Sequence, residues 1–108
     1  MDMVDQYDVW LVGLDPTIGS EIQKTRPCLI ISPDEMNHNI NTVIIAPLTS
    51  TVKDYPTRVS VVLDGKKGQI VLDQIRTVDK VRLIKKIGFV DSRTSVNVRD
   101  ALFDMFDS

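Results

Sequence analysis

The sequence is poor in three features that would otherwise narrow its chemistry: cysteine, histidine and long apolar runs. Cys28 is the only cysteine in 108 residues, so the chain has no internal disulfide, which suits a reducing cytosol. His38 is the only histidine, which excludes an acid–base pair of two histidines and argues against an ordinary metal site. No apolar run approaches the ~20 residues of a membrane span, and the acidic start lacks the basic flank of a signal peptide. We therefore expect a cytoplasmic protein that uses no metal, no other cofactor and no membrane.

The two rare side chains have plain structural explanations. Cys28 stands inside an apolar run, before Leu29, and is expected to be a buried small hydrophobic residue rather than a nucleophile. His38 lies in a polar stretch and is expected to be a solvated loop residue. Contact with a nucleic-acid base, or proton transfer, stays open as an alternative for His38.

The charge of the chain is small overall but unevenly distributed. The formal net charge is −2, so the whole chain does not have the character of a nucleic-acid binder. Residues 1–21 hold five acidic side chains and no basic one, whereas residues 53–86 hold nine basic side chains against four acidic ones. A basic middle permits a phosphate-binding face on an acidic protein, although solvated loop lysines explain the same counts.

Short apolar segments separated by turn residues predict a mainly β domain that spans residues 1–108. The expected strands are Tyr7–Leu14, Pro27–Ser32, Thr42–Pro47, Arg58–Leu63, Gln69–Thr77 and Ile84–Val90. Thr42–Pro47 is apolar on both faces and is therefore expected at the centre of the sheet. Asp64-Gly65 predicts a hairpin turn, and Asp79 is expected to cap one helical turn. Six short strands favour a small, strongly curved, barrel-like sheet.

A C-terminal helix is expected to begin at Ser92 or Thr94. Val98, Leu102 and Phe106, together with Met105, recur at helical spacing and indicate a face for the core or for a dimer. Dimerisation is expected, because a domain of 108 residues gains stability from the further apolar area that it buries.

A polar connector, Gly19 to Pro27, joins the apolar runs Val9–Leu14 and Cys28–Ile31. Its composition is that of a solvated loop. It brings a carboxylate, Glu21, and a guanidinium, Arg26, close together in sequence. We expect this loop to supply the main catalytic groups.

Three ordered motifs resemble the MazF/PemK/Kid family of bacterial toxins. The first comprises Asp8-Val9-Trp10-Leu11-Val12, then Leu14-Asp15-Pro16-Thr17-Ile18-Gly19-Ser20-Glu21, then Thr25-Arg26-Pro27. The second is Ala46-Pro47-Leu48-Thr49-Ser50, and the third is Asp73-Gln74-Ile75-Arg76-Thr77-Val78-Asp79. The resemblance implies an SH3-like barrel, a homodimer, and metal-independent cleavage of single-stranded mRNA at short sequences. It also implies a cognate antitoxin whose acidic, flexible tail covers the RNA groove.

The resemblance assigns catalytic positions to Arg26 and Thr49, and to Glu21 in some members. Asp73 matches a proposed carboxylate base. Some members have a histidine where this chain has Ser20 and an arginine where it has Val71, so those two proton-transfer groups are absent here.

Cleavage of RNA by its own 2′-hydroxyl requires a base, an acid and fixed positive charge for the phosphorane. The Arg26 guanidinium suits the last role, because it stays charged and matches phosphate oxygens with a planar fork. A hydroxyl at Thr49 can donate to a phosphate oxygen. Glu21 and Asp73 remain as bases, with Glu21 slightly favoured. The structural alternatives are an Arg26–Glu21 ion pair, a turn hydroxyl at Thr49, and an Asp73 that accepts backbone N–H bonds.

Substrate contacts are expected from polar and basic side chains beside these motifs, because unstacked RNA bases and their phosphates are bound by such groups. The expected contacts are Ser20, Lys24, Asn37, Ser50, Lys53, Arg58, Gln74 and Arg76. Trp10 is expected in the core rather than as a base-stacking platform.

Two other functions remain open. A gyrase-binding toxin of the CcdB kind has a similar fold but needs no cleavage chemistry. A barrel that binds RNA without cutting it is the third possibility. The combination of Glu21, Arg26 and Thr49 favours the nuclease, because a pure binder has no need of them together.

Overall fold

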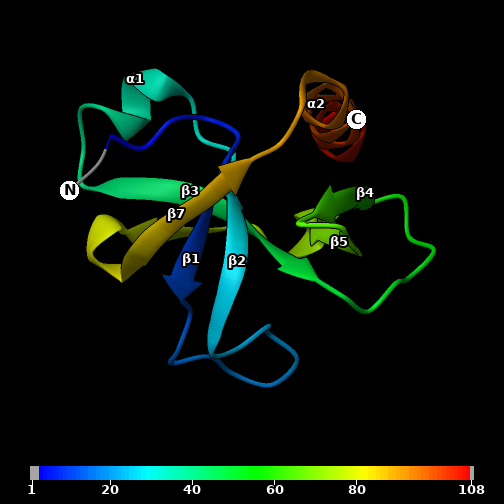
Figure 1. The fold of residues 1–108 in the computed structure, drawn as a ribbon, viewed down its shortest axis with the longest axis horizontal. Coiled ribbons are helices and arrows are strands. Elements are labelled where there is room, and N and C mark those ends of the chain that lie inside the picture. The colour runs from blue at the N-terminus through cyan, green and yellow to red at the C-terminus, as the bar shows by residue number, and fades with distance from the viewer. Residues whose placement is uncertain (1–2, 108) are drawn as a thin grey trace.

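The computed structural model describes residues 3–107, which form a curled β-sheet with a helix packed against one part of it (Figure 1). The elements, in chain order, are β1 (Asp8–Gly13), β2 (Thr25–Ile30), α1 (Asp34–Asn37), β3 (Thr42–Thr49), β4 (Arg58–Leu63), β5 (Lys66–Val71), the 3₁₀ turn η1 (Leu72–Gln74), β6 (Arg76–Asp79), the 3₁₀ turn η2 (Lys80–Arg82), β7 (Leu83–Phe89) and α2 (Ser92–Phe106).

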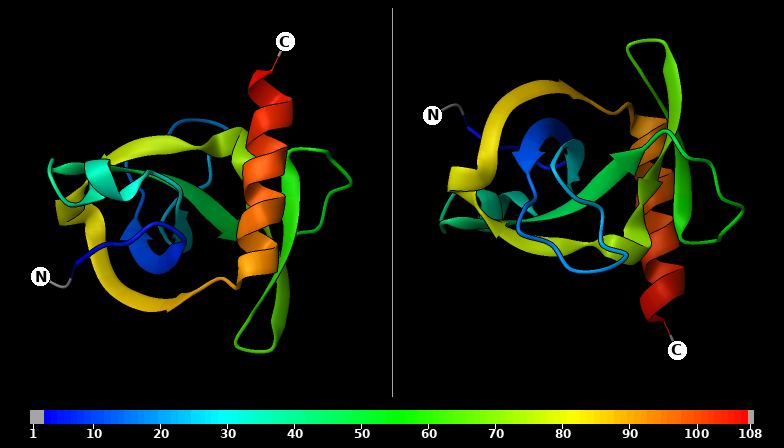
Figure 2. Two further views of the ribbon diagram at one scale, coloured as in Figure 1. Left: turned by 90° about the horizontal axis from the view of Figure 1, so that it is seen from above. Right: turned by 90° about the horizontal axis from the view of Figure 1, so that it is seen from below.

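All strand pairs are antiparallel, in the order β4-β5-β3-β2-β1-β7, and β6 pairs with β3. Figure 2 shows the sheet curling round on itself, with α2 lying across β4 and β5. β3 pairs with β2, β5 and β6, so the strand that is apolar on both faces is central, as predicted. The expectation of a small, mainly β barrel with a C-terminal helix is confirmed.

Side chains of the middle strands alternate between two apolar clusters, because successive strand residues point to opposite faces. The first cluster includes Trp10, Val12, Cys28, Ile30 and Ile45. The second cluster includes Val9, Leu29, Ala46, Leu48 and Val98 of α2. Trp10 and Cys28 are both buried, at 3% and 0% exposed, as the sequence predicts. Burial raises the pKa of the Cys28 thiol to about 12, so this side chain is no nucleophile at neutral pH.

The predicted strand Gln69–Thr77 is wrong, because the chain divides it into β5, η1 and β6. β5 pairs Ile70 with Leu48, whereas β6 pairs Arg76 with Ile45, so the two registers on β3 differ by three residues. η1 has that same length, three residues. The extra residues interrupt the pairing with β3 near Pro47, which has no N–H to donate to a partner strand. Asp73 therefore lies on this turn and not in a regular strand.

The predicted turns and caps are largely confirmed. Asp64 and Gly65 both have positive φ, of 50° and 75°, as a two-residue hairpin turn requires, although β5 begins at Lys66 rather than Gln69. Asp79 accepts a hydrogen bond from Val81 N–H and caps η2 at 2.9 Å. α2 begins at Ser92, one of the two expected starts, after the N-cap Asp91.

Three of the four residues on the expected apolar face of α2 pack in the core and the fourth is exposed, so the expected role of this face in a dimer stays a prediction. Val98 is buried, and Leu102 and Met105 pack partly buried against the second cluster. Phe106 is 68% exposed and does not belong to the core. None of the helices in residues 3–107 has the length and apolar character needed to cross a membrane.

Candidate active site

The connector between β1 and β2 projects from one end of these strands, at the bottom of Figure 1. Its neck is closed by two hydrogen bonds. Leu14 N–H donates to the Lys24 carbonyl at 2.9 Å, and Lys24 N–H donates to Asp15 Oδ1 at 3.0 Å. Lys24 adopts a positive φ of 68° at the point where the loop returns to β2. The loop that holds Glu21 therefore leaves and re-enters the sheet at a fixed place.

Arg26 and Thr49 lie together where β2 and β3 reach this end of the sheet. Cys28 pairs with Pro47, and continuing that antiparallel register by two residues sets Arg26 opposite Thr49. Both side chains line one hollow of about 220 Å³, which we call the Arg26–Thr49 hollow. Its rim also includes Ser50, Lys66 and Lys67. A guanidinium, a hydroxyl and two ammonium groups thus face one small space.

The polar atoms of Arg26 and Thr49 keep donors available for a ligand. Thr49 Oγ1 accepts a hydrogen bond from Thr51 N–H at 3.1 Å, which fixes the oxygen and leaves its proton free to be donated. Arg26 Nε donates to the Gln23 carbonyl at 3.3 Å, and this is the one hydrogen bond that its guanidinium makes within residues 3–107. A phosphate oxygen is the ligand that this donor set favours.

Glu21 and Asp73 line a second hollow, of about 230 Å³, which we call the Glu21–Asp73 hollow. Gln74 and Arg76 also line it, and Pro47 forms part of its apolar wall. Pro47 is only two residues from Thr49 on β3, a separation of roughly 6–7 Å along a strand. The two hollows are therefore neighbours on the same end of the sheet.

The carboxylate of Asp73 is already engaged. It accepts hydrogen bonds from Arg58 Nε at 2.8 Å, Arg58 Nη2 at 3.3 Å and Thr57 Oγ1 at 2.9 Å. The Arg58 hydrogen bonds, chiefly, hold the pKa of Asp73 below its ordinary value, and Thr57 adds to this effect. The structural alternative for Asp73, a carboxylate that accepts only backbone N–H bonds, is wrong, since side chains are its main partners.

Glu21 is exposed and accepts one hydrogen bond, from Ile18 N–H at 2.6 Å. Within residues 3–107 it forms no ion pair with Arg26. The structural alternative, in which Glu21 and Arg26 only pair with each other across the loop, is therefore wrong. Glu21 and Arg26 face different, adjoining hollows rather than a single one.

One predicted substrate contact is wrong. Asn37 is buried, at 1% exposed. Its Oδ1 accepts from the Ser32 hydroxyl at 2.5 Å, and its Nδ2 donates to the Ser32 carbonyl at 2.9 Å. It stabilises the turn at α1, at the opposite end of β1 and β2 from the loop (Figure 1). Polar loop chemistry suggested a ligand contact, but the side chain satisfies buried backbone groups instead.

The other predicted contacts divide into exposed and engaged side chains. Ser20, Lys24, Ser50 and Lys53 are exposed and remain predictions. Arg58, Gln74 and Arg76 are part-buried and bound within the protein. Arg58 holds Asp73, whereas Gln74 accepts from Ile22 N–H at 2.7 Å and Arg76 donates to the Leu14 carbonyl at 3.1 Å.

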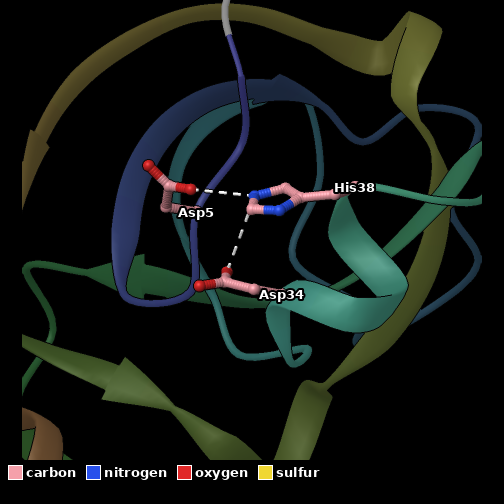
Figure 3. Close-up of side chains that lie close together, drawn as sticks. All are labelled: Asp5, Asp34 and His38. Carbon is pink, nitrogen blue, oxygen red and sulfur yellow. Dashed lines mark hydrogen bonds and ion pairs between the residues drawn. The ribbon is translucent and has the colours of Figure 1, made fainter.

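His38 lies far from both hollows, beside α1. Its Nε2 is 2.9 Å from Asp5 Oδ1 and 3.9 Å from Asp34 Oδ1 (Figure 3). These three side chains form a group that could hold a metal ion, since their ligand atoms lie within 4.8 Å of one another. Hydrogen bonds within the protein already use these groups: His38 Nε2 contacts Asp5 Oδ1, and Asp34 Oδ1 also accepts from Gln6 N–H at 2.7 Å. His38 is exposed, as predicted, and it is hydrogen-bonded to Asp5.

Sequence reasoning missed four residues around the site. Lys66 and Lys67 entered the sequence analysis only in the charge count of residues 53–86. Their position directly after an Asp-Gly turn was the signal that could have marked them as candidate site residues. Gly68 could have been noticed as a glycine inside a strand, which often marks a close backbone approach. Arg82 donates to the Asp15 carbonyl at 2.6 Å and to the Gly13 carbonyl at 3.3 Å, and no local pattern predicts this.

Comparison with known proteins agrees with the sequence motifs. A family model for the PemK-like, MazF-like toxin of type II toxin–antitoxin systems matches residues 5–106. The chain is 35% identical over 106 residues to endoribonuclease EndoA of Bacillus subtilis (strain 168), covering 93% of this chain and 91% of the relative. It is 36% identical over 106 residues to endoribonuclease MazF of Staphylococcus epidermidis, covering 93% and 88%. Both relatives are named as endoribonucleases, which is the class of enzyme that the motifs predict for this chain.

Solved structures share the fold. MazF (form I) from Deinococcus radiodurans matches with a TM-score of 0.87 at 24% identity, covering 100% of both chains. An endoribonuclease in complex with its cognate antitoxin, from a mycobacterial species, matches with a TM-score of 0.82 at 24% identity, covering 96% of this chain and 95% of that one. The family match over nearly the whole chain and the curated relatives together decide the assignment: this chain belongs to the PemK-like, MazF-like family of toxins of type II toxin–antitoxin systems.

Proposed function

We propose that this toxin is an endoribonuclease that cleaves single-stranded mRNA at a short recognised sequence, without a metal ion. The 2′-oxygen attacks the adjacent phosphorus and the bond from phosphorus to the 5′-oxygen breaks. The products are a 2′,3′-cyclic phosphate and a 5′-hydroxyl. The observation that carries the proposal is that Arg26 and Thr49 line the same hollow with donors free for a phosphate.

Arg26 and Thr49 stabilise the phosphorane in this mechanism. The guanidinium donates two parallel hydrogen bonds to the equatorial oxygens and offsets the charge that grows on them. The Thr49 hydroxyl, fixed by Thr51 N–H, donates to one of the same oxygens. Neither group changes its protonation state, so neither is the base.

Glu21 takes the proton from the 2′-hydroxyl. Asp73 is the less available of the two carboxylates, because Arg58 and Thr57 occupy its oxygens and hold its pKa below the ordinary value. Glu21 is exposed at the neighbouring hollow and needs to release only the Ile18 N–H bond to reach a substrate. The leaving 5′-oxygen takes a proton from solvent, since no histidine lines either hollow.

A second copy of the chain is proposed to pack beside the Arg26–Thr49 hollow. Val52, Val62 and Phe89 are 68%, 63% and 73% exposed, and they line one broad concavity. Lys67 and Gly68 line both this concavity and the Arg26–Thr49 hollow. Apolar side chains this exposed mark an interaction surface, and a dimer there would extend the RNA groove across two copies.

An antitoxin is proposed as the second macromolecular partner, because a mycobacterial endoribonuclease of the same fold was solved with its cognate antitoxin. Arg26, Lys66 and Lys67 offer a basic rim that an acidic, flexible tail can occupy in place of RNA phosphates. Binding of that tail would inhibit by covering the hollow. A toxin that acts on mRNA implies a cytoplasmic location.

The test is to incubate the protein with a mixed single-stranded RNA in EDTA and to sequence the 5′ ends of the fragments. We expect discrete fragments with 5′-hydroxyl ends that share a short sequence around the cut. The same preparation of Arg26→Ala controls for contaminating nuclease. Intact RNA together with gyrase inhibition would instead support the CcdB-like function, and intact RNA with retarded migration would support a binding barrel.

A further inference from the structure

The side-chain amide of Gln74 is hydrogen-bonded to the backbone of the β1–β2 loop on both sides of Glu21. Gln74 Oε1 accepts a hydrogen bond from Ile22 N–H at 2.7 Å. Gln74 Nε2 makes a longer contact, of 3.5 Å, with the Ser20 carbonyl oxygen. One amide group thus contacts the residue before Glu21 and the residue after it, across 52 to 54 positions of sequence.

Two arginines that follow Gln74 hold the other side of the same loop. Arg76 donates to the Leu14 carbonyl at 3.1 Å. Arg82 donates to the Asp15 carbonyl at 2.6 Å and to the Gly13 carbonyl at 3.3 Å. The segment from η1 to η2 therefore fixes the loop at its start through guanidinium groups and near Glu21 through an amide.

The position of Gln74 also relates the loop to the rest of the site. It lies on η1 directly after Asp73, and it is half-buried in the wall of the Glu21–Asp73 hollow. Glu21 itself is exposed and makes its one side-chain hydrogen bond, within residues 3–107, to the backbone of its own loop. The Ile22 side chain packs partly buried against the first apolar cluster, and Gln74 adds the hydrogen bonds that join the backbone on both sides of Glu21 to the barrel.

We infer that Gln74 is a positioning residue, which holds the Glu21 backbone at a fixed distance from the Arg26–Thr49 hollow. This inference rests on the proposed function, in which Glu21 takes the proton from the 2′-hydroxyl. Displacement of a catalytic group by about 1 Å can lower a rate on the order of 10²-fold.

The test compares Gln74→Met, which keeps the length of the side chain but loses both hydrogen bonds, with Gln74→Glu, which keeps the acceptor for Ile22 N–H. We expect kcat to fall on the order of 10–10²-fold in Gln74→Met, with KM little changed, and Gln74→Glu to recover most of the loss. Gln6→Met is the matched control, because Gln6 donates to the Ile31 carbonyl at 3.0 Å, far from the site.

Two further readouts separate positioning from general damage to the fold. Amide exchange at Ile22 should accelerate in Gln74→Met and remain unchanged in Gln6→Met. In a Glu21→Gln background, Gln74→Met should have little additional effect, because the group that it positions is already lost.

The outcomes are distinguishable. If Glu21→Gln reduces cleavage but Gln74→Met cuts RNA like the wild type, the positioning role is wrong and the proposed function stands. If Gln74→Met lowers the rate by the same factor with and without Glu21→Gln, Gln74 does not act through Glu21. If Glu21→Gln itself cuts at the wild-type rate, the base assignment in the proposed function fails.

Discussion

A β-carbon at Gly68 would lie 2.7 Å from the carbonyl oxygen of Thr49. β5 therefore approaches β3 closely at the residue whose hydroxyl we assign to the phosphorane, and only glycine permits that approach without a shift. Because Thr49 pairs with Gln69, the next residue of β5, any adjustment at Gly68 is transmitted to Thr49.

Gly68→Ala should lower the cleavage rate at least 10-fold, since the methyl group must displace Thr49 or β5. The expected loss of stability is roughly 1–3 kcal/mol, the usual cost of overpacking. Single-turnover cleavage together with urea unfolding measures both effects, with Val81→Ala, which is 83% exposed and lines neither hollow, as the control. Wild-type cleavage by Gly68→Ala would show that the position of Thr49 is not critical.

Glu21→Gln and Asp73→Asn should differ in severity. We expect Glu21→Gln to lower the rate about 10²–10⁴-fold, the range of a lost general base, because Asp73 is bound by Arg58 and Thr57. Asp73→Asn should lose less. Single-turnover cleavage rates measured over a range of pH identify the base. Loss of the base lowers the rate and also flattens the acidic limb of the plot of rate against pH. A more severe loss in Asp73→Asn would transfer the role of base to Asp73.

The Arg58–Asp73 pair predicts a pH dependence of stability. Asp73 has a lowered pKa in the folded protein, so it contributes stability that is fully present above its unfolded value, ~3.9, and is lost as the pH falls through the folded pKa. Asp73→Asn should reduce stability at pH 7 by up to about 1 kcal/mol, because the pair is partly exposed. It should also weaken the decline of stability below pH ~4. Urea unfolding at pH 7 and pH 3, with the exposed Asp104→Asn as control, checks this. Equal losses at both pH values would contradict it.

Lys66 and Lys67 should contribute phosphate contacts. Replacing either with Gln should weaken RNA binding and reduce the slope of log K against log salt by about 0.7, the value for one phosphate contact on a single strand. Lys85→Gln, on the exposed surface of β7, should leave the slope unchanged. Binding of an uncleavable 2′-deoxy analogue at several salt concentrations provides the measurement. Unchanged slopes in both Lys66→Gln and Lys67→Gln would remove them from the RNA path.

The sequence predicts most of the barrel because the apolar segments keep a period of two and end at recognisable turns. It fails at Gln69–Thr77, where an apolar run continues through a turn. Ile70, Val71 and Leu72 are all fully buried, and hydrophobic pattern alone cannot separate a buried strand from a buried turn. The three-residue change of register on β3 depends on pairing with a distant strand, and a local pattern does not contain that information.

The candidate site was partly predictable for the same reason. Arg26 and Thr49 stand beside two apolar segments that the sequence identifies as strands. The antiparallel pairing of these strands then sets the two residues opposite each other. Asn37 and Gln74 were expected to contact RNA, but Asn37 is buried beside Ser32 and Gln74 binds the backbone of the loop. An amide side chain has the same donor and acceptor groups whether its partner is a base or a peptide, so only the fold distinguishes these uses.

Arg26 and Thr49 are assigned a shared action on one phosphate, and a double-mutant cycle of cleavage rates measures that action most directly. Arg26→Ala and Thr49→Val should each lower the single-turnover rate in EDTA, Arg26→Ala by at least about 10²-fold, while circular dichroism shows that both remain folded. The double variant should be less impaired than the product of the two single effects, because each group acts on the same charge. Wild-type-like cutting by Arg26→Ala, or independent effects of the two substitutions, would contradict the account.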